Sequence, residues 1–237
     1  MTDARANIAG SPAPAVGAQV RATVPGDVVD AHVHLGLSVG DLVSADDCET
    51  GTRAAACGGV TTVFDFAEQK KGEGLVEDAR RKTTRYAREA CVDFALHTAV
   101  TDMDCVDAEQ MRLSKEFGVT SFKAYMVYDI MLDDGAFVEL LALSKATGTL
   151  VEVHAENPAI IRRKISRLKA EGKTAPWYHY ESRPEFVEAE GVKRAIHLAQ
   201  SMGARLYIVH LACAEGLQAV RDARAAGCEI YLETCPQ

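Results

Sequence analysis

The sequence predicts an α/β fold built on a parallel sheet. Two observations support this: apolar, strand-like runs alternate with amphipathic, charge-bearing stretches, and metal-binding or titratable side chains close several of the apolar runs. A parallel strand covered on both faces is a near-continuous apolar run, and the carboxyl ends of such strands meet at one edge of the sheet. The predicted strands cover residues 27–35, 59–66, 92–99, 119–126, 149–154, 205–210 and 228–233.

Helix signals fall between these strands. Two serines have capping-box spacing, Ser44 with Asp47 and Ser182 with Glu185, the second with Pro184 in the first turn. Glycines just before later strands are expected to end the preceding helices: Gly118, Gly148, Gly203 and Gly227. The long connection 155–203 is predicted to be helical with a polar loop at 171–184, and it is long enough to cover a site. Seven strands are one fewer than a (β/α)₈ barrel needs, so the fold is either an open sheet or a barrel cut short.

Composition limits the class of protein. The 237 residues are 48% hydrophobic and 25% charged, the balance of a globular chain that could form one large α/β domain. A net charge of -8 without a dense basic run argues against nucleic acid as a partner. Seven cysteines without a CxxC pair argue against a disulfide framework. With no signal peptide or membrane span expected, we predict a cytoplasmic protein, with a flexible leader at 1–20 and one domain at 21–237.

Four histidines close three of the predicted strands. His32 and His34 are two residues apart, so both imidazoles project to the same side of their strand. His154 and His210 each end a later strand. A lone histidine is more often a core or surface residue, but four in this arrangement predict a metal site. The other three, His97, His179 and His197, are assigned to structure or solvent.

Lys123 lies inside the apolar run VTSFKAYMV, where an ammonium would have to be desolvated. One interpretation gives Lys123 no chemical role: its charged end simply reaches solvent at the end of the strand. The alternative is that burial lowers its pKa, so that the neutral amine captures carbon dioxide as a carbamate and becomes a carboxylate ligand. Such a ligand could bridge two metal ions about 3.5 to 4 Å apart.

An ordered set of segments gives the chain a family resemblance. The segments are PGDVVDAHVHLGL, GTRAAACGGVTTVFDF, TSFKAYMVYD, VHAEN, SRP, VHLACAEGL and ETCPQ. From about Val24 to Gln237 the chain resembles the cyclic amidohydrolases, specifically their hydantoinase and dihydropyrimidinase branch. The resemblance implies a metal-dependent-hydrolase TIM (β/α)₈ barrel that is incomplete here, with about seven of eight βα units and without the accessory β domain.

The resemblance also implies cofactors and ligands. It places one zinc ion at His32 and His34 and a second at His154 and His210, bridged by N-carboxylated Lys123. Tyr128 would donate a hydrogen bond to the substrate carbonyl as its oxyanion forms, while Tyr125 could be the packed aromatic residue. A tyrosine at this offset favours hydantoinase or dihydropyrimidinase over allantoinase or dihydroorotase.

The implied reaction is hydrolysis of a small cyclic ureide or imide, a hydantoin or dihydropyrimidine, to an N-carbamoyl amino acid. In the family the general base is an aspartate that ends the eighth strand, which we expect to be absent from this chain. Asp65 and Glu156 are weak candidates to replace it, so we expect little or no turnover. The competing interpretations are a non-catalytic scaffold relative and an inactive fragment. Relatives form tetramers, so the resemblance implies a homo-oligomer. We expect no nucleic-acid or membrane partner.

Overall fold

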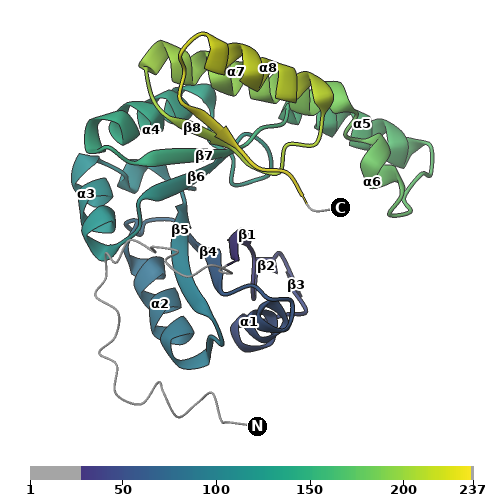
Figure 1. The fold of residues 1–237 in the computed structure, drawn as a ribbon. Helices are drawn as coiled ribbons and strands as arrows, with labels where there is room; N and C mark the ends of the chain where they lie inside the picture. The colour runs from purple at the N-terminus through teal and green to yellow at the C-terminus, as the bar shows by residue number, and fades with distance from the viewer. Residues whose placement is uncertain (1–27, 236–237) are drawn as a thin grey trace.

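Seven parallel strands form one strongly curved sheet, in the order in which they occur along the chain (Figure 1). The computed structural model describes residues 28–235, so the expected leader at 1–20 lies outside the described residues. The strands of the sheet are β1 Val29–Val33, β4 Thr62–Glu68, β5 Asp93–Ala99, β6 Ser121–Tyr125, β7 Leu150–His154, β8 Leu206–Ile208 and β9 Ile230–Leu232. Each predicted strand overlaps one of them, and the prediction of an incomplete (β/α)₈ barrel is confirmed.

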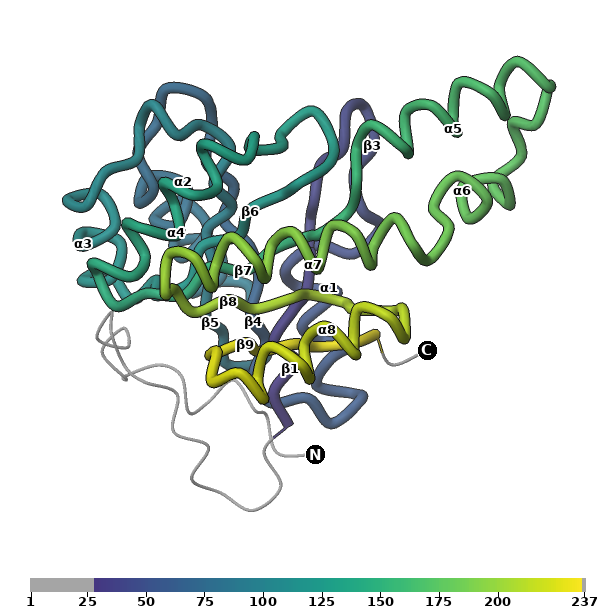
Figure 2. The backbone as a smooth tube through the Cα atoms, turned by 90° about the horizontal axis from the view of Figure 1, so that it is seen from above, coloured from purple at the N-terminus to yellow at the C-terminus, as the bar shows by residue number. Residues whose placement is uncertain are grey.

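Helices follow most of the strands and cover the outer face of the sheet. They are α1 Cys48–Cys57, α2 Glu77–Glu89, α3 Ala108–Phe117, α4 Asp134–Thr147, α5 Pro158–Ala170, α6 Tyr178–Glu181, α7 Glu185–Met202 and α8 Ala214–Ala225, with a 3₁₀ turn at Met103–Cys105. Figure 2 shows α5 and α6 projecting away from the body of the barrel. No helix within residues 28–235 has both the length and the apolar character needed to cross a bilayer.

Both predicted capping boxes are wrong. Ser44 accepts a hydrogen bond from the amide of Leu37 and so closes a small hairpin, β2 Ser38–Val39 with β3 Leu42–Val43, which the sequence analysis missed. Helix α1 begins instead after Asp47, whose carboxylate accepts from the amide of Thr50. Ser182 donates to the carbonyl of His179, and α7 starts after Pro184 without a side-chain cap.

The predicted helix ends are confirmed. Gly118, Gly148 and Gly203 each stop a helix in the left-handed conformation, and Gly227 has a positive φ just after α8.

Alternation along the strands divides the sheet into two faces. Outward side chains such as Phe122, Val151 and Leu206 pack with the helices in the main apolar core. Asp65 also faces outward, since its carboxylate meets Lys82 and Tyr86 of α2. The inward row includes Phe66, whose ring contacts the rings of His97, of His32 in β1 and of His34 just after β1. The barrel interior is therefore the polar side of the sheet.

Gly191 of α7 sets how closely this helix approaches the end of β7. A Cβ atom built at Gly191 would lie 2.6 Å from the carbonyl carbon of Ala155 and 2.7 Å from the amide nitrogen of Glu156. Both are backbone atoms and cannot rotate away. The absence of a side chain at Gly191 thus permits the contact that supports the segment after His154.

Gly191→Ala is expected to lower the free energy of unfolding by about 1 to 3 kcal/mol, because the overpacking outweighs the better helix propensity of alanine. Urea unfolding of the purified chain measures this. Gly135→Ala, at an exposed position in α4 where a Cβ would meet Oδ1 of the Asp133 side chain at 3.3 Å, is the control and should change the free energy of unfolding by less than about 1 kcal/mol. A Gly191→Ala protein as stable as the wild type would contradict the proposed close packing.

Candidate active site

His32 of β1 and His34, just after the end of β1, point their Nε2 atoms at a common region. Nε2 of His32 lies 3.1 Å from Nε2 of His34. Two nitrogens bound to one tetrahedral zinc at ordinary bond lengths are about 3.3 Å apart. The pair therefore fits a single metal ion, as the alternation of strand side chains predicted.

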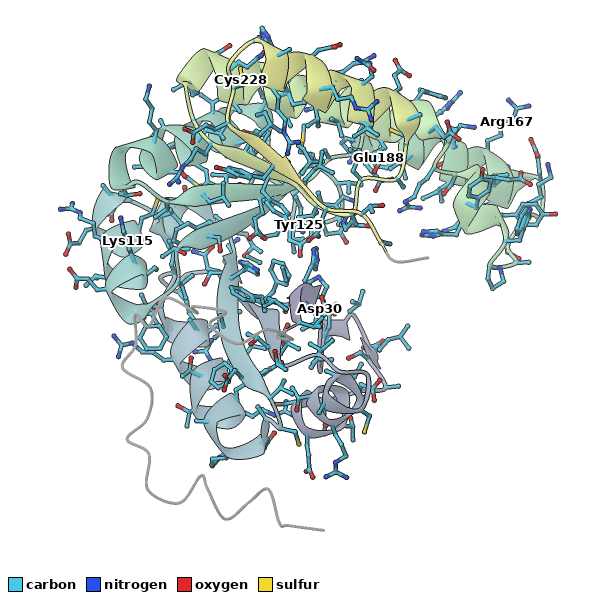
Figure 3. All side chains as sticks on the ribbon, viewed as in Figure 1. Asp30, Lys115, Tyr125, Arg167, Glu188 and Cys228 are labelled. Atoms are coloured by element: carbon cyan, nitrogen blue, oxygen red, sulfur yellow. The ribbon has the colours of Figure 1, made fainter. Side chains whose placement is uncertain are left out.

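The other two predicted histidines come to the same place. The His154 and His210 rings are 4.6 Å apart between centroids, and the His210 ring is 5.7 Å from that of His32. His210 has a positive φ of 37°, which is uncommon for a residue with a side chain. Residues from the ends of β1, β7 and β8 thus meet inside the curved sheet. The labelled Tyr125 and Asp30 mark two facing sides of this region in Figure 3.

Lys123 lies beneath these histidines and is 1% exposed. Its Nζ is 5.0 Å from the centre of the Phe66 ring and 5.5 Å from that of Tyr125. Burial lowers the pKa of Lys123 to about 8, although Glu152 and Glu233 oppose the change. At pH 7 roughly a tenth of such an amine is neutral. The charged end of Lys123 therefore does not reach solvent. The neutral amine, which is the form that reacts with carbon dioxide, is populated near neutral pH.

Two of the histidines are held in the neutral form that binds metals. Burial, together with the nearby His32 and Lys123, lowers the pKa of His34 to about 3. Burial and the neighbouring His154 and Lys123 do the same for His210, again to about 3. Neutral imidazole is the ligand form, so the site favours metal over protons.

These shifts predict an acid-sensitive apoprotein. The unfolded histidines titrate near 6.5 and the folded ones near 3, so the unfolded state binds more protons between these values. Stability is therefore full above pH 6.5 and falls as the pH drops, by up to about 1.4 kcal/mol per pH unit for each histidine. Urea unfolding in chelator at pH 6.5 and 5 measures the slope. The double variant His34→Gln, His210→Gln should flatten it, and an unchanged slope would contradict the assignment.

Glu233 is a site residue that the sequence analysis missed. Nδ1 of His32 donates to its carboxylate, the hydroxyl of Tyr207 donates at 2.9 Å, and the amide of His210 donates at 3.3 Å. Burial alone would raise the pKa of Glu233, but the hydrogen bond from His32 and the other donors lower it to about 2. A carboxylate on the far nitrogen of a ligand histidine fixes the ring and its tautomer. The available signal was its position, just after the last strand in the quoted segment ETCPQ.

A second carboxylate orients His154. Nε2 of His154 donates to Glu156 at 2.7 Å, and Nε of Arg183 lies 3.5 Å from the other carboxylate oxygen. This arrangement leaves Nδ1 of His154 for a metal ion. Arg183, also missed, lies between α6 and α7, so the projecting segment returns to the site at this point. Glu156 is held by two partners and Asp65 faces α2, so neither suggested base is free in the barrel interior.

Both tyrosines after Lys123 border the site. The Tyr128 ring is 5.1 Å from the His154 ring and half exposed, while Tyr125 is more buried, with its ring 6.1 Å from that of His154. Burial and nearby Glu156 raise the pKa of Tyr128, which keeps its hydroxyl protonated as a hydrogen-bond donor. Tyr128 has a φ of 75°, so the backbone is strained where the side chain is presented.

Because of that strain, glycine and alanine are expected to reverse their usual order of stability at residue 128. At most positions glycine is less stable than alanine, but at a positive φ the Cβ atom is the source of the strain. We expect Tyr128→Gly to be more stable than Tyr128→Ala by about 1 kcal/mol. Thermal or urea unfolding of the two variants measures the difference directly. The opposite order would show that the backbone at residue 128 is relaxed.

The side chains of the described residues alone do not form a complete metal site, and the three other histidines lie in different surroundings. Within residues 28–235, no three His, Cys, Asp or Glu side chains are arranged as a complete metal cluster. The ligand set proposed from the sequence includes Lys123, which supplies oxygen ligands only after carboxylation. His197 is exposed on α7, and His179 lies 3.3 Å from Arg183 in the projecting segment. His97 is buried in the barrel interior.

A curved parallel sheet with histidines gathered at the carboxyl ends of its strands is typical of hydrolases built on the (β/α)₈ barrel. The Amidohydrolase family profile matches residues 23–234, and the chain belongs to this family. Its curated relatives include a D-hydantoinase of Geobacillus stearothermophilus, 37% identical over 212 residues, which covers 88% of this chain and 45% of the relative. A D-phenylhydantoinase of Escherichia coli O9:H4 (strain HS) is 40% identical over 211 residues, 88% of this chain and 46% of the relative.

Solved structures agree. The crystal structure of dihydropyrimidinase from Brevibacillus agri NCHU1002 superposes with a TM-score of 0.85 at 37% identity, covering 90% of this chain and 47% of that one. L-hydantoinase (dihydropyrimidinase) from Arthrobacter aurescens gives 0.77 at 26% identity, over 90% of this chain and 47% of that chain. The predicted family resemblance is confirmed. The chain spans about half the length of the relatives it matches.

Proposed function

We propose that this chain carries the metal-binding part of a hydantoinase or dihydropyrimidinase site. The reaction is hydrolysis of the cyclic amide of a hydantoin or dihydropyrimidine to an N-carbamoyl amino acid. The observation that carries the proposal is the convergence of four imidazoles above one buried lysine of lowered pKa. The names of the relatives, D-hydantoinase and dihydropyrimidinase, support the substrate class.

The proposed cofactors are two zinc ions bridged by N-carboxylated Lys123. When bound, they supply Lewis acidity that lowers the pKa of a bridging water and polarises the amide carbonyl. His32 and His34 would hold one ion and His154 and His210 the other. The 3.1 Å separation of the first two Nε2 atoms and the neutral state of His34 and His210 support this fit.

Two further residues of the site would orient a metal ligand and donate a hydrogen bond to the substrate. Glu233 holds Nδ1 of His32, which turns Nε2 toward the shared region. Tyr128 would donate a hydrogen bond from its hydroxyl to the substrate carbonyl as negative charge develops there. We assign no general base within residues 28–235, since Glu156 is occupied by His154 and Arg183. A homo-oligomeric state and a cytoplasmic location stay predictions.

Metal analysis of the purified chain tests the proposal. After incubation with zinc and bicarbonate, a folded sample should contain two zinc ions per chain and give a ¹³C carbamate signal from labelled bicarbonate. A well-folded sample with less than about 0.2 zinc per chain would favour the non-catalytic scaffold instead. Turnover is assayed with dihydrouracil and a 5-substituted hydantoin, and we expect little or none from the 237-residue chain. A measurable rate from the dinuclear zinc form would contradict that last expectation.

A further inference from the structure

The strand that presents His32 and His34 is irregular just where the histidines begin. β1 pairs with β4 at Val29 and Asp30 and again at Val33, but the register shifts between Asp30 and Val33. A bulge of this kind re-aims side chains and leaves backbone groups without their regular ladder partners. β1 is also at the edge of the seven-stranded sheet, so within the described sheet β4 is its neighbour on one side only. The amide of His32 donates to Oδ1 of Asp30 at 3.2 Å, and the carbonyl of Ala31 is supported from another strand.

His97 supplies a hydrogen bond at this position. Its Nε2 is 3.1 Å from the carbonyl oxygen of Ala31, which can only accept, so the imidazole N–H donates. Its Nδ1 is 2.7 Å from Oε1 of Glu152 and also close to Oγ of Ser121. Both His97 and Glu152 are buried. The imidazole of β5 thus connects the backbone of β1 to a carboxylate on β7, across the barrel interior.

Ring packing adds a second link between His97 and the same histidines. The Phe66 ring lies 4.8 Å from His97, 4.7 Å from His32 and 4.6 Å from His34, measured between ring centres. Phe66 is fully buried. A displacement of His97 would therefore reach both metal-ligand candidates through the backbone and through this ring.

We propose that His97 is a positioning residue for the metal ligands of β1. Its N–H···O=C bond to Ala31 takes the place of a ladder bond at the bulge and keeps the Nε2 atoms of His32 and His34 at the spacing of a shared metal ion. Glu152 holds the imidazole from the opposite side. The inference rests on the proposed function, because it concerns ligands for that metal pair. It gives a specific task to His97, which the sequence predicts to be structural or solvent-facing.

Two conservative variants separate this role from simple packing. The amide nitrogen of glutamine reaches about as far as imidazole Nε2, whereas that of asparagine reaches only as far as Nδ1. His97→Gln can keep the bond to Ala31, and His97→Asn cannot. His97→Phe keeps an aromatic ring beside Phe66 and removes both donors. His197→Phe, at an exposed position on α7, is the control.

Cobalt(II) titration of the full 237-residue chain in the presence of bicarbonate, followed by its visible absorption, is the measurement. The wild type, His97→Gln and the control should bind two ions with the same spectrum. His97→Asn and His97→Phe should bind one of the two ions about 10- to 100-fold more weakly, with an altered band. Urea unfolding in chelator shows whether each variant is folded.

Equal binding by the wild type and His97→Asn would overturn the role of His97 while leaving the proposed function intact. Affinity losses that follow the stability of the variants, and are the same for glutamine and asparagine, would also overturn it. A wild-type chain that binds no cobalt would overturn the proposed function, and the role of His97 with it. If His97→Phe does not fold, the glutamine and asparagine pair still decides.

Discussion

Lys123→Met is expected to stabilise the metal-free protein and to abolish the paired metal site. Lys123 is 1% exposed, and burial lowers the pKa of its amine. Its Nζ lies over the faces of the Phe66 and Tyr125 rings. Methionine fills a similar volume without a charge to desolvate. The lowered pKa of Lys123 means that the fold disfavours its charged form, by roughly 1.4 kcal/mol for each pKa unit, and methionine removes this cost. We therefore expect a gain of about 1 to 4 kcal/mol.

The effect on metal binding should be the opposite. Without the carbamate, the zinc content should fall from two ions to one or none per chain. Any turnover by the whole protein should fall by about 10³-fold or more, since the lost metal contribution is several kcal/mol. Urea unfolding in chelator and metal analysis after zinc loading measure the two effects on the same samples.

The control for this pair of measurements is Lys115→Met. Lys115 is exposed and donates to the carbonyl of Thr147, so both stability and zinc content should change little. A Lys123→Met protein that keeps two zinc ions would contradict the bridging role. A protein destabilised by several kcal/mol would show that the ammonium is well paired inside the barrel.

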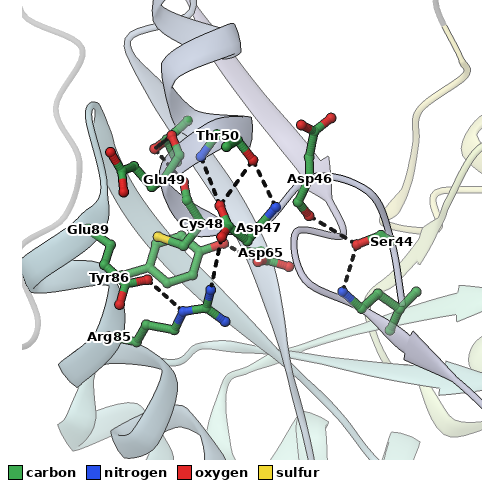
Figure 4. A network of polar contacts seen from close by, with 12 residues as sticks. Ser44, Asp46, Asp47, Cys48, Glu49, Thr50, Asp65, Arg85, Tyr86 and Glu89 are labelled. Carbon is green, nitrogen blue, oxygen red and sulfur yellow. Dashed lines mark hydrogen bonds and ion pairs between the residues drawn. The ribbon is translucent and has the colours of Figure 1, made fainter. Parts of the chain in front are cut away.

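Lys82→Met is expected to have the largest destabilising effect, about 3 to 5 kcal/mol, because it leaves a buried carboxylate without its cation. Asp65 is fully buried, and Nζ of Lys82 is 2.8 Å from its Oδ2. The partners that remain are the hydroxyl of Tyr86, shown beside Asp65 in Figure 4, and the amide of Phe66, which donates to Oδ1 at 2.6 Å; neither carries a positive charge. Lys82 also donates to the carbonyl of Phe66 at 2.6 Å, so its loss disturbs the ring that packs on the site histidines.

Arg85→Met is the matched control on the same helix. Arg85 pairs with Glu89 and lies 3.7 Å from Asp47, but its side chain is 43% exposed (Figure 4). Such surface pairs contribute about 0 to 1 kcal/mol. Equal losses from Lys82→Met and Arg85→Met in urea unfolding would contradict the distinction between the buried and the exposed pair.

The strands and ligand candidates could be predicted because their signals are local. An apolar run closed by a histidine carries both the strand and the position of its last side chain, and parallel order then brings those ends to one edge. Three of the seven strands carry both signals, and the apolar run alone predicts the other four. The five ligand candidates also come together, as the ring contacts and the shared pKa shifts indicate.

The missed features depend on contacts between distant segments. Glu233 meets His32 across most of the chain, and no local pattern predicts this. Arg183 reaches Glu156 only after α5 and α6 have projected and returned. Ser44 has the spacing of a helix cap, but its hydroxyl is used by the hairpin before α1. A side chain that can serve two neighbouring turns is assigned by the path of the backbone, which spacing alone does not determine.

The contact between His32 and Glu233 links the two borders of the seven-stranded sheet. His32 is on β1, Glu233 follows β9, and no backbone ladder joins these two strands within the described residues. Likewise, His32 lies on β1 and His210 follows β8, and four other strands lie between β1 and β8 in the sheet. A metal ion bound by such residues would stabilise the curved form of the sheet, because flattening the sheet would pull its ligands apart. The free energy of metal binding would then be, in part, the energy that keeps the sheet bent.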